Sequence, residues 1–351
     1  MRKKWAKNAV AVIDSGNYVN GSNKKLFESL WAKKLSVSFA TGVGNGLDGL
    51  ILALRALNLN NGQVVAVPAH TFIATWIAVR QAGAVPYGLD VDSNGLIDLN
   101  KLEGVQDKIS AVIPVHMHGK MVDMERISRW AAKNKVFVIE DASQSHLAKF
   151  RDRYAGSWGD IGVFSLYPTK NLGALGDAGV VVTNSLSYKE KIDSLSNYGF
   201  ALKDKYNQKS LGINSRLDEI QAAFLISNLD NLAEWNKVRE EIAEKYISGI
   251  SHSEIRPLNY EIEESNVWHH FPVICERRDE LKKYLDTKSI ETVIHYPTSS
   301  ATIYGQSENF YNSEDKFKNS EFISRNILSL PISPWHKSKQ INKVIKALNE
   351  F

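Results

Sequence analysis

The chain has 351 residues, 43% of them hydrophobic and 23% charged, which is enough for about two globular domains with a large core. The formal net charge is +4 and no basic stripe is present, which argues against a nucleic-acid-binding surface. The single cysteine, Cys275, excludes a disulfide framework and favours a cytoplasmic location, and no apolar run is long enough to predict a membrane span.

The first two-thirds of the chain alternates short apolar runs with helical patterns. Strands are predicted at residues 35–40, 63–67, 84–89, 111–115, 136–139, 161–165 and 179–183. Helices are predicted at residues 47–57, 71–82 and 124–134. Such alternation is typical of an α/β fold with a mostly parallel sheet that helices cover on both faces.

The pattern changes toward the C-terminus. Two long helices are predicted at residues 216–229 and 232–246, and further helices at 278–288 and 340–349. Strands are predicted at residues 267–275 and 292–296. We interpret residues 1–239 as a large domain and residues 240–351 as a smaller α/β domain. The polar, irregular residues 299–318 predict a surface loop or a lid.

The most informative residue is a lysine on a glycine-rich loop. Lys170 follows Pro168, which interrupts regular structure, and the apolar residues 136–139 upstream end in Glu140 and Asp141. A pyridoxal phosphate enzyme requires a lysine that forms a Schiff base and a carboxylate that holds a proton on the pyridine nitrogen. A surface lysine and a capping aspartate are the ordinary explanations of each residue alone. Their combination favours the cofactor site.

A glycine-rich motif lies between the first predicted strand and the first predicted helix. Backbone N–H groups at such a helix N-terminus can bind a phosphate. Residues 44–49 also spell G-x-G-x-x-G, but the next strand lacks the acidic residue that a dinucleotide fold requires and runs into His70. The motif therefore favours a single phosphate, with a ligand-free glycine turn as the alternative. Ser165, five residues before Lys170, offers a hydroxyl to the same phosphate.

Three further residues are candidates from their positions. Phe72 follows the second strand and offers a ring to stack on the pyridine, although a core position explains it equally well. Gln144 lies three residues past Asp141 and offers a donor to the phenolate oxygen of the cofactor. Asn214 opens a long helix, where it is either a site residue or a helix cap. Two close histidine pairs lack the further ligands that a metal needs, so no metal site is predicted.

In this order, the motifs resemble the StrS/DegT family of pyridoxal phosphate-dependent nucleotide-sugar aminotransferases, from about residue 13 to the C-terminus. The motifs that carry the resemblance include Gly42-Val43-Gly44-Asn45-Gly46-Leu47-Asp48, Val67-Pro68-x-x-Thr71-Phe72, Ile139-Glu140-Asp141-Ala142-Ser143-Gln144, Phe164-Ser165-x-Tyr167-Pro168-Thr169-Lys170, Asn214-Ser215-Arg216-Leu217-Asp218-Glu219 and Ile294-His295-Tyr296-Pro297. The resemblance implies an aspartate-aminotransferase-like fold, in which helices flank a mostly parallel mixed sheet. It also implies a homodimer with both active sites at the subunit interface.

The resemblance assigns a role to each matching residue. Lys170 becomes the Schiff-base lysine and Asp141 the partner of the pyridine nitrogen. Gln144 becomes the phenolate contact and Phe72 the aromatic ring that stacks on the cofactor. The expected phosphate ligands are Gly46, Leu47 and Ser165, with Asn214 reaching the phosphate from the other subunit. The expected substrate-binding residues are His295, Tyr296 and Tyr167.

The function implied by the resemblance is ping-pong transfer of an amino group from L-glutamate to a keto group of a nucleotide-linked deoxysugar. The motifs look most like those of enzymes that aminate carbon 3 of a dTDP-3-keto-6-deoxyhexose for surface polysaccharide or glycoside biosynthesis. The alternatives are a 4-keto sugar as acceptor and a non-catalytic, cofactor-binding regulatory relative. Lys170 argues against a related sugar dehydratase, which would carry a histidine there, and the missing acidic residue argues against an NAD-dependent dehydrogenase.

Overall fold

The computed structural model describes residues 2–59, 61–201, 204–258, 265–304, 311–312 and 317–351. An eight-stranded sheet with the order β1-β9-β8-β5-β4-β2-β3-β14 forms its centre. The strands are β1 (Phe39–Val43), β2 (Val64–Pro68), β3 (Val85–Leu89), β4 (Ala111–Val112), β5 (Phe137–Asp141), β8 (Ile161–Ser165), β9 (Gly179–Thr183) and β14 (Tyr311–Asn312). Neighbouring strands are parallel, except that β9 runs antiparallel to both β1 and β8.

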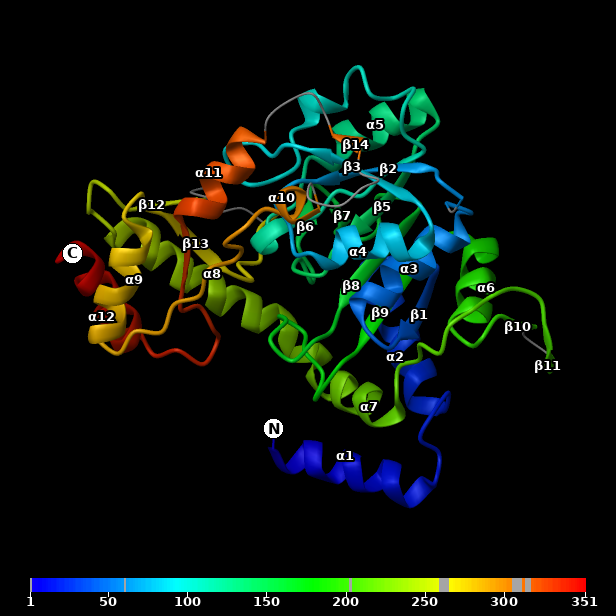
Figure 1. Ribbon diagram of the computed structural model, residues 1–351. Helices are drawn as coiled ribbons and strands as arrows, with labels where there is room; N and C mark the ends of the chain where they lie inside the picture. The colour runs from blue at the N-terminus through cyan, green and yellow to red at the C-terminus, as the bar shows by residue number, and fades with distance from the viewer. Residues whose placement is uncertain (1, 60, 202–203, 259–264, 305–310, 313–316) are drawn as a thin grey trace.

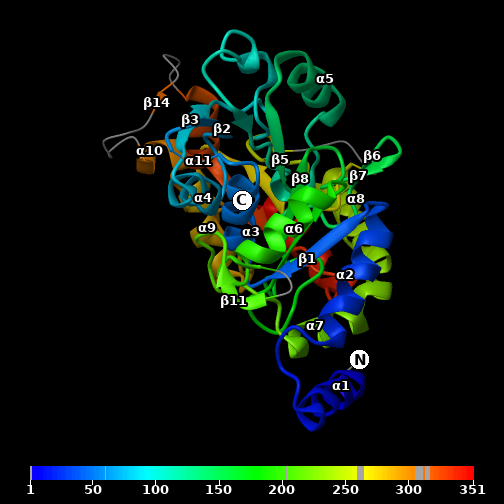
Figure 2. The same ribbon diagram turned by 90° about the vertical axis from the view of Figure 1, so that its right-hand side faces the viewer.

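Helices cover both faces of this sheet (Figure 1). One face carries α3 (Gly46–Ala56), α4 (Ala74–Ala82) and α6 (Leu186–Leu195). The other face carries α2 (Ser22–Leu35), α5 (Met124–Asn134) and α7 (Glu219–Asn228). In Figure 2, α4 and α2 lie on opposite sides of β8. The helix α3 packs very closely, because a Cβ at Gly49 would lie 2.7 Å from the Val163 side chain.

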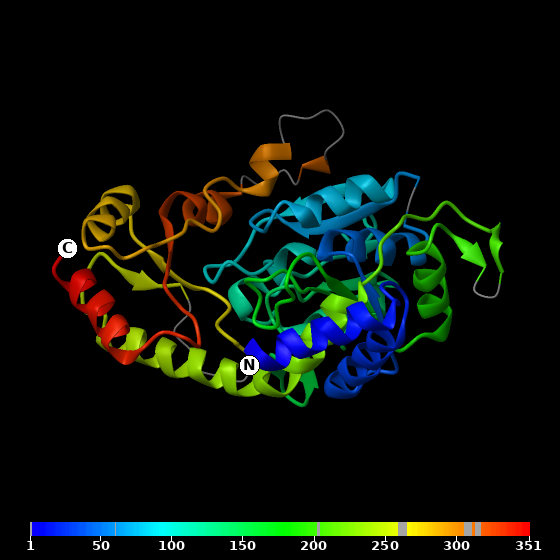
Figure 3. The same cartoon turned by 90° about the horizontal axis from the view of Figure 1, so that it is seen from below.

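A second, smaller sheet follows the long helix α8 (Leu232–Gly249), which crosses from the large sheet to the C-terminal part of the molecule (Figure 3). It has the order β12-β13-β15, with β12 (Arg256–Pro257), β13 (Phe271–Ile274) and β15 (Ile327–Leu330). The helices α9 (Arg278–Thr287) and α12 (Ser338–Asn349) complete a separate apolar core with these strands. The predicted domain boundary after residue 239 falls inside α8, and the division into two domains stays a prediction.

The N-terminal helix α1 (Arg2–Ser15) packs against α7. The Trp5 ring lies 4.7 Å from the ring of Phe224, and its indole N–H donates to the Asn228 side chain at 2.9 Å. Only Val12 of α1 is buried. The sequence pattern therefore gave too little apolar periodicity to predict this helix.

The remaining described elements are short or connect the two sheets. They are β6 (Lys149–Phe150), β7 (Arg153–Tyr154), β10 (Phe200–Ala201), β11 (Asp204–Gln208), α10 (Ser300–Tyr304) and α11 (Lys318–Asn326), with 3₁₀ turns at Leu99–Leu102, Met117–Gly119 and Leu229–Asn231. No helix in the described part of the chain is long and apolar enough to cross a bilayer.

The predicted α/β fold with a mostly parallel sheet is confirmed, and β8, β9 and α5 have the predicted bounds. The strand predicted at residues 292–296 is wrong, because Val293 makes only a single bridge, to Ser329. The strand predicted at 35–40 begins late, since Leu35 still belongs to α2 and Ser36 ends that helix with a left-handed φ of 55°. Within the loop predicted at 299–318, residues 305–310 and 313–316 lie outside the described residues.

Candidate active site

A cavity of about 440 Å³ opens at the carboxyl ends of the parallel strands and extends to the C-terminal part of the molecule. This edge is where open α/β sheets bind ligands. Every predicted site residue except Asn214 lines the cavity: Gly46, Leu47, Phe72, Asp141, Gln144, Ser165, Tyr167, Lys170, His295 and Tyr296. The fold therefore brings together residues that are far apart in the sequence.

The carboxylate of Asp141 is held in place by two donors. Asp141 ends β5, and only 5% of its surface is exposed. Its Oδ2 accepts a hydrogen bond from Thr75 Oγ1 at 2.9 Å, and its Oδ1 accepts one from the Ser143 N–H at 3.2 Å. Sequence reasoning missed Thr75, because the hydroxyl belongs to a helix 66 residues away from Asp141. Both donors fix the orientation of the carboxylate, which can accept a hydrogen bond from a protonated ring nitrogen.

Lys170 is presented by a tight turn after β8. Its N–H donates to the Tyr167 carbonyl at 2.9 Å, which closes a turn with Pro168 in the second position. A Cβ at Gly173 would lie 2.5 Å from the Pro168 carbonyl oxygen, so the return of the loop requires glycine. Burial lowers the pKa of Lys170 to about 8, against the raising effect of Asp141. The amine is therefore partly neutral near neutral pH and can act as a nucleophile or a base.

The first turn of α3 faces Ser165. Asn45 caps this helix, with its Oδ1 accepting from the Asp48 N–H at 2.8 Å, while the N–H groups of Gly46 and Leu47 lack acceptors within the helix. A Cβ at Gly46 would lie 2.9 Å from Ser165 Cβ, so only glycine allows this approach. The free N–H groups, the helix dipole and a serine hydroxyl fit a phosphate group.

Aromatic and amide groups flank the space between Asp141 and the cavity mouth. Phe72 is 53% exposed, and its ring lies 5.5 Å from the Tyr296 ring. The Oε1 of Gln144 accepts from the His118 N–H at 2.7 Å, which directs its Nε2 toward the Tyr296 hydroxyl at 3.4 Å. A flat ring bearing a phosphate, a basic nitrogen and a carbonyl group has a fitting partner for each part here. The residues present therefore fit pyridoxal phosphate.

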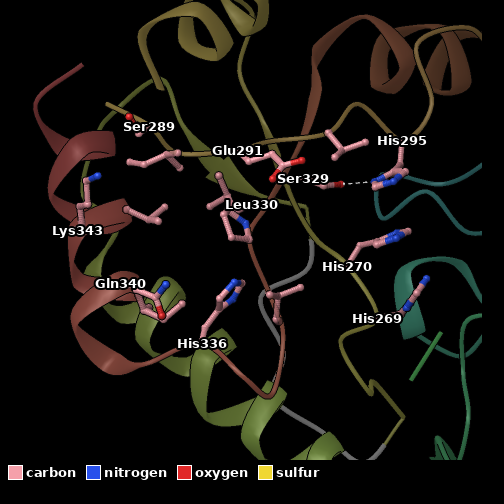
Figure 4. A pocket seen from close by; sticks show the side chains of 16 residues that line it. His269, His270, Ser289, Glu291, His295, Ser329, Leu330, His336, Gln340 and Lys343 are labelled. Atoms are coloured by element: carbon pink, nitrogen blue, oxygen red, sulfur yellow. Dashed lines mark hydrogen bonds between the residues drawn. The ribbon is translucent and has the colours of Figure 1, made fainter. Parts of the chain in front are cut away.

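Three imidazoles line both this cavity and a second cavity, the one drawn in Figure 4; we call His269, His270 and His295 the histidine wall. The His270 ring stacks on the His295 ring at 3.9 Å and 7°. His269 Nδ1 lies 3.1 Å from Asn171 Oδ1, and His295 Nδ1 lies 2.9 Å from Ser329 Oγ. Burial lowers the pKa of all three, that of His295 to about 4, so the wall is neutral at physiological pH. Only His295 was predicted as a site residue.

Asn214 lies outside the cavity of its own chain. It is exposed, and its backbone forms an isolated antiparallel bridge with Asn197. Its expected contact with a phosphate in the other subunit stays a prediction. Within the described ranges, no group of three or more histidine, cysteine, aspartate or glutamate side chains could hold a metal ion.

The lowered pKa of Lys170 predicts how its reactivity depends on pH. In cofactor-free protein, the rate of reaction with added pyridoxal phosphate should rise roughly tenfold per pH unit and level off above about pH 8, because only the neutral amine attacks. Asp141→Asn removes the charge that raises this pKa, so its midpoint should be lower. Stopped-flow absorbance measures both. A wild-type midpoint near the ordinary lysine value of 10.5 would contradict the account.

Comparison with known proteins identifies the same family that the sequence motifs resemble. The model of the DegT/DnrJ/EryC1/StrS aminotransferase family matches residues 1–349. The dTDP-3-amino-3,4,6-trideoxy-alpha-D-glucose transaminase of Streptomyces venezuelae is 38% identical over 346 residues, which cover 97% of this chain and 90% of that protein. The dTDP-3-amino-3,6-dideoxy-alpha-D-galactopyranose transaminase of Aneurinibacillus thermoaerophilus is 37% identical over 342 residues, which cover 97% of this chain and 93% of that protein.

A solved structure extends the agreement to three dimensions. The crystal structure of S. venezuelae DesV in complex with a ketimine intermediate has a TM-score of 0.92 at 36% identity, and the match covers 99% of this chain and 94% of that chain. The expected family, fold, cofactor and type of reaction are confirmed. The chain belongs to the DegT/DnrJ/EryC1/StrS aminotransferase family and is a pyridoxal phosphate-dependent aminotransferase.

Proposed function

We propose that the protein transfers an amino group from L-glutamate to carbon 3 of a dTDP-linked 3-keto-6-deoxyhexose. The observation that carries this proposal is the meeting of Lys170 and Asp141 in one cavity, with Asp141 at the end of β5 and Lys170 in the turn after β8. Two similar proteins, at 38% and 37% identity, are named as transaminases of dTDP-linked 3-amino sugars, which supports the choice of sugar and nucleotide.

Pyridoxal phosphate, when bound, supplies an electron-withdrawing ring and the carbon that carries the amino group between the two substrates. Asp141 would hold a proton on the ring nitrogen, and its own donors, Thr75 and Ser143, keep it oriented. The phosphate would bind the N–H groups at the start of α3 and the hydroxyl of Ser165. Phe72 would cover one face of the ring from the cavity mouth.

Lys170 moves the proton. Its Nζ would accept a proton from Cα of the amino donor and deliver it to the cofactor carbon that carries the amino group between the two substrates. A pKa of about 8 for Lys170 suits both the uptake and the release of the proton, because the protonated and neutral amine are close in free energy near neutral pH. The close return of the loop at Gly173 fixes the backbone turn from which Lys170 lines the cavity.

The sugar would bind beside neutral hydrogen-bonding groups. Tyr167, His295 and Tyr296 line the cavity, and Tyr167 is half exposed at its edge. Burial, and then the charge of Asp141, raise the pKa of Tyr296, so its hydroxyl stays protonated and can donate. Burial lowers the pKa of His295, so its imidazole stays neutral. These groups can bind sugar hydroxyls without adding a charge near Lys170.

We further propose a cytoplasmic homodimer whose subunits each have a large domain, residues 1–239, and a small domain, residues 240–351. The single cysteine supports this compartment. The separate apolar core around the small sheet supports the two domains. The exposed position of Asn214, outside the cavity of its own chain, supports a site completed by a second copy.

The two half-reactions can be followed by absorption. Added L-glutamate should replace the visible band of the bound cofactor with a near-ultraviolet band, and a dTDP-linked 3-keto-6-deoxyhexose should restore the visible band. Lys170→Ala should lose this interconversion, because no other amine in the described lining can move the proton. Restoration by a 4-keto sugar but not by the 3-keto sugar would contradict the proposed position of amination.

Mixed dimers test whether Asn214 acts across the interface. Lys170→Ala and Asn214→Ala are each expected to be impaired as homodimers. In a mixed dimer, one site should combine the intact Lys170 of one subunit with the intact Asn214 of the other. Activity should therefore return when the two variants are unfolded and refolded together. No gain over the separate variants, with dimers verified by sedimentation, would contradict a shared site.

A further inference from the structure

The side chain that follows Lys170 is buried outside the catalytic cavity. Asn171 is 4% exposed and does not line that cavity, whereas Thr169 and Lys170 do. A buried side-chain amide needs acceptors for its N–H groups and a donor for its oxygen. Asn171 finds all of these in segments that lie 65 to 98 residues further along the chain. The turn that carries Lys170 is therefore connected to distant parts of the fold through the neighbouring side chain.

The amide of Asn171 bonds to three groups. Its Nδ2 donates to the Val267 carbonyl and to Asn236 Oδ1, both at 2.9 Å. Its Oδ1 lies 3.1 Å from His269 Nδ1. Asn236 belongs to α8, whereas Val267 and His269 lie just before β13 of the small sheet. One side chain thus ties the turn after β8 both to the long helix and to the segment that leads into the small sheet.

Backbone carbonyls fix the orientation of both amides. A carbonyl can only accept, so the atom of Asn171 that faces the Val267 carbonyl is its nitrogen. For the same reason the atom of Asn236 that faces the His146 carbonyl at 2.9 Å is nitrogen. The oxygen of Asn171 is then the atom that faces His269, so Nδ1 of this imidazole carries the proton. In a neutral ring, Nε2 is left with a lone pair and can only accept.

His269 is also held through its backbone, and its ring stays neutral. Arg239 Nη1 donates to the carbonyls of Trp268 and His269 at 3.2 and 3.3 Å. Burial, and then His270 and the charges of Lys170 and Arg239, lower the pKa of His269 well below its ordinary value. Because His269 and Lys170 line the same cavity, the contacts of Asn171 bear on both of them.

We propose that Asn171 is a positioning residue for the proton transfer by Lys170. Its amide holds the turn that carries the lysine, and it fixes His269, a residue of the cavity wall, in the tautomer with an unprotonated Nε2. This assignment depends on the proposed function, because it concerns where Lys170 lies when the proton moves. A displacement of about 1 Å in a reacting group can slow a reaction about a hundredfold. Loss of the Asn171 contacts should therefore slow proton transfer much more than it weakens substrate binding.

Asn171→Leu tests this role, with Asn326→Leu as the matched control. Leucine is similar in size to asparagine but makes no hydrogen bonds. Asn326 is also buried, and its amide donates to the Phe322 carbonyl within α11, away from the cavity lining. In the holoenzyme, Asn171→Leu should slow the half-reaction with L-glutamate about tenfold to a hundredfold, with KM nearly unchanged. The control should behave as wild type.

The kinetic isotope effect separates positioning from a loss of folded protein. With glutamate deuterated at Cα, Asn171→Leu should show a larger isotope effect than wild type, because proton transfer becomes slower relative to the other steps. A smaller amount of folded enzyme would lower the rate without raising the isotope effect. Asn236→Ala removes one partner of Asn171 and is the milder variant, which should change the rate in the same direction by less. Wild-type rates and isotope effects in both variants would overturn the inference.

Nitrogen NMR of the cofactor-free protein with ¹⁵N-labelled histidine gives a readout that needs neither turnover nor a variant that folds poorly. The His269 signals, assigned by their loss in His269→Gln, should show a protonated Nδ1 and an unprotonated Nε2 in the wild type. A proton on Nε2 instead would overturn the inference. If the wild-type enzyme itself fails to convert its cofactor with glutamate, the proposed function fails, whereas the NMR signals still decide whether Asn171 fixes His269.

Discussion

The parallel pairing of β5 with β8 is the constraint on which the site depends. Its register places Asp141 opposite Val163, so the carboxylate ends its strand just as the neighbouring strand approaches Ser165. The chain then turns back at Pro168 and presents Lys170 to the same cavity. A slip of one residue would exchange the side chains on the two faces of these strands, each of which packs into a different apolar core.

The surroundings of Lys170 limit the number of charges near it. Asp141 alone raises its pKa, and burial lowers it further than that carboxylate can compensate. The nearby imidazoles, including His146 and the histidine wall, are neutral because burial lowers their pKa values. The site thus contains a reactive amine, the fixed carboxylate of Asp141, a second carboxylate at Asp177 and a set of uncharged hydrogen-bonding groups. This balance suits a cofactor that itself brings a phosphate and a protonated ring.

Much of the large sheet could be predicted from the sequence, because its strands are continuous apolar runs separated by helical patterns. The same runs place Asp141 at the end of a strand and Lys170 in a loop, where their chemistry is recognisable. Thr75, His269 and His270 could not be predicted as site residues, since their contacts depend on which distant segments the fold brings together. The prediction of a strand at residues 292–296 was wrong for the same reason. An extended apolar pattern does not reveal whether the fold supplies a partner strand.

Reductive trapping tests most directly whether Lys170 is the residue that bonds the cofactor. The purified holoenzyme would be treated with sodium borohydride, digested and analysed by mass spectrometry for a pyridoxyl group. The account predicts this group on the peptide that contains Lys170 and its absence from the other lysine peptides. A stable pyridoxyl group on another lysine, with Lys170 unmodified, would contradict the arrangement of the site described above.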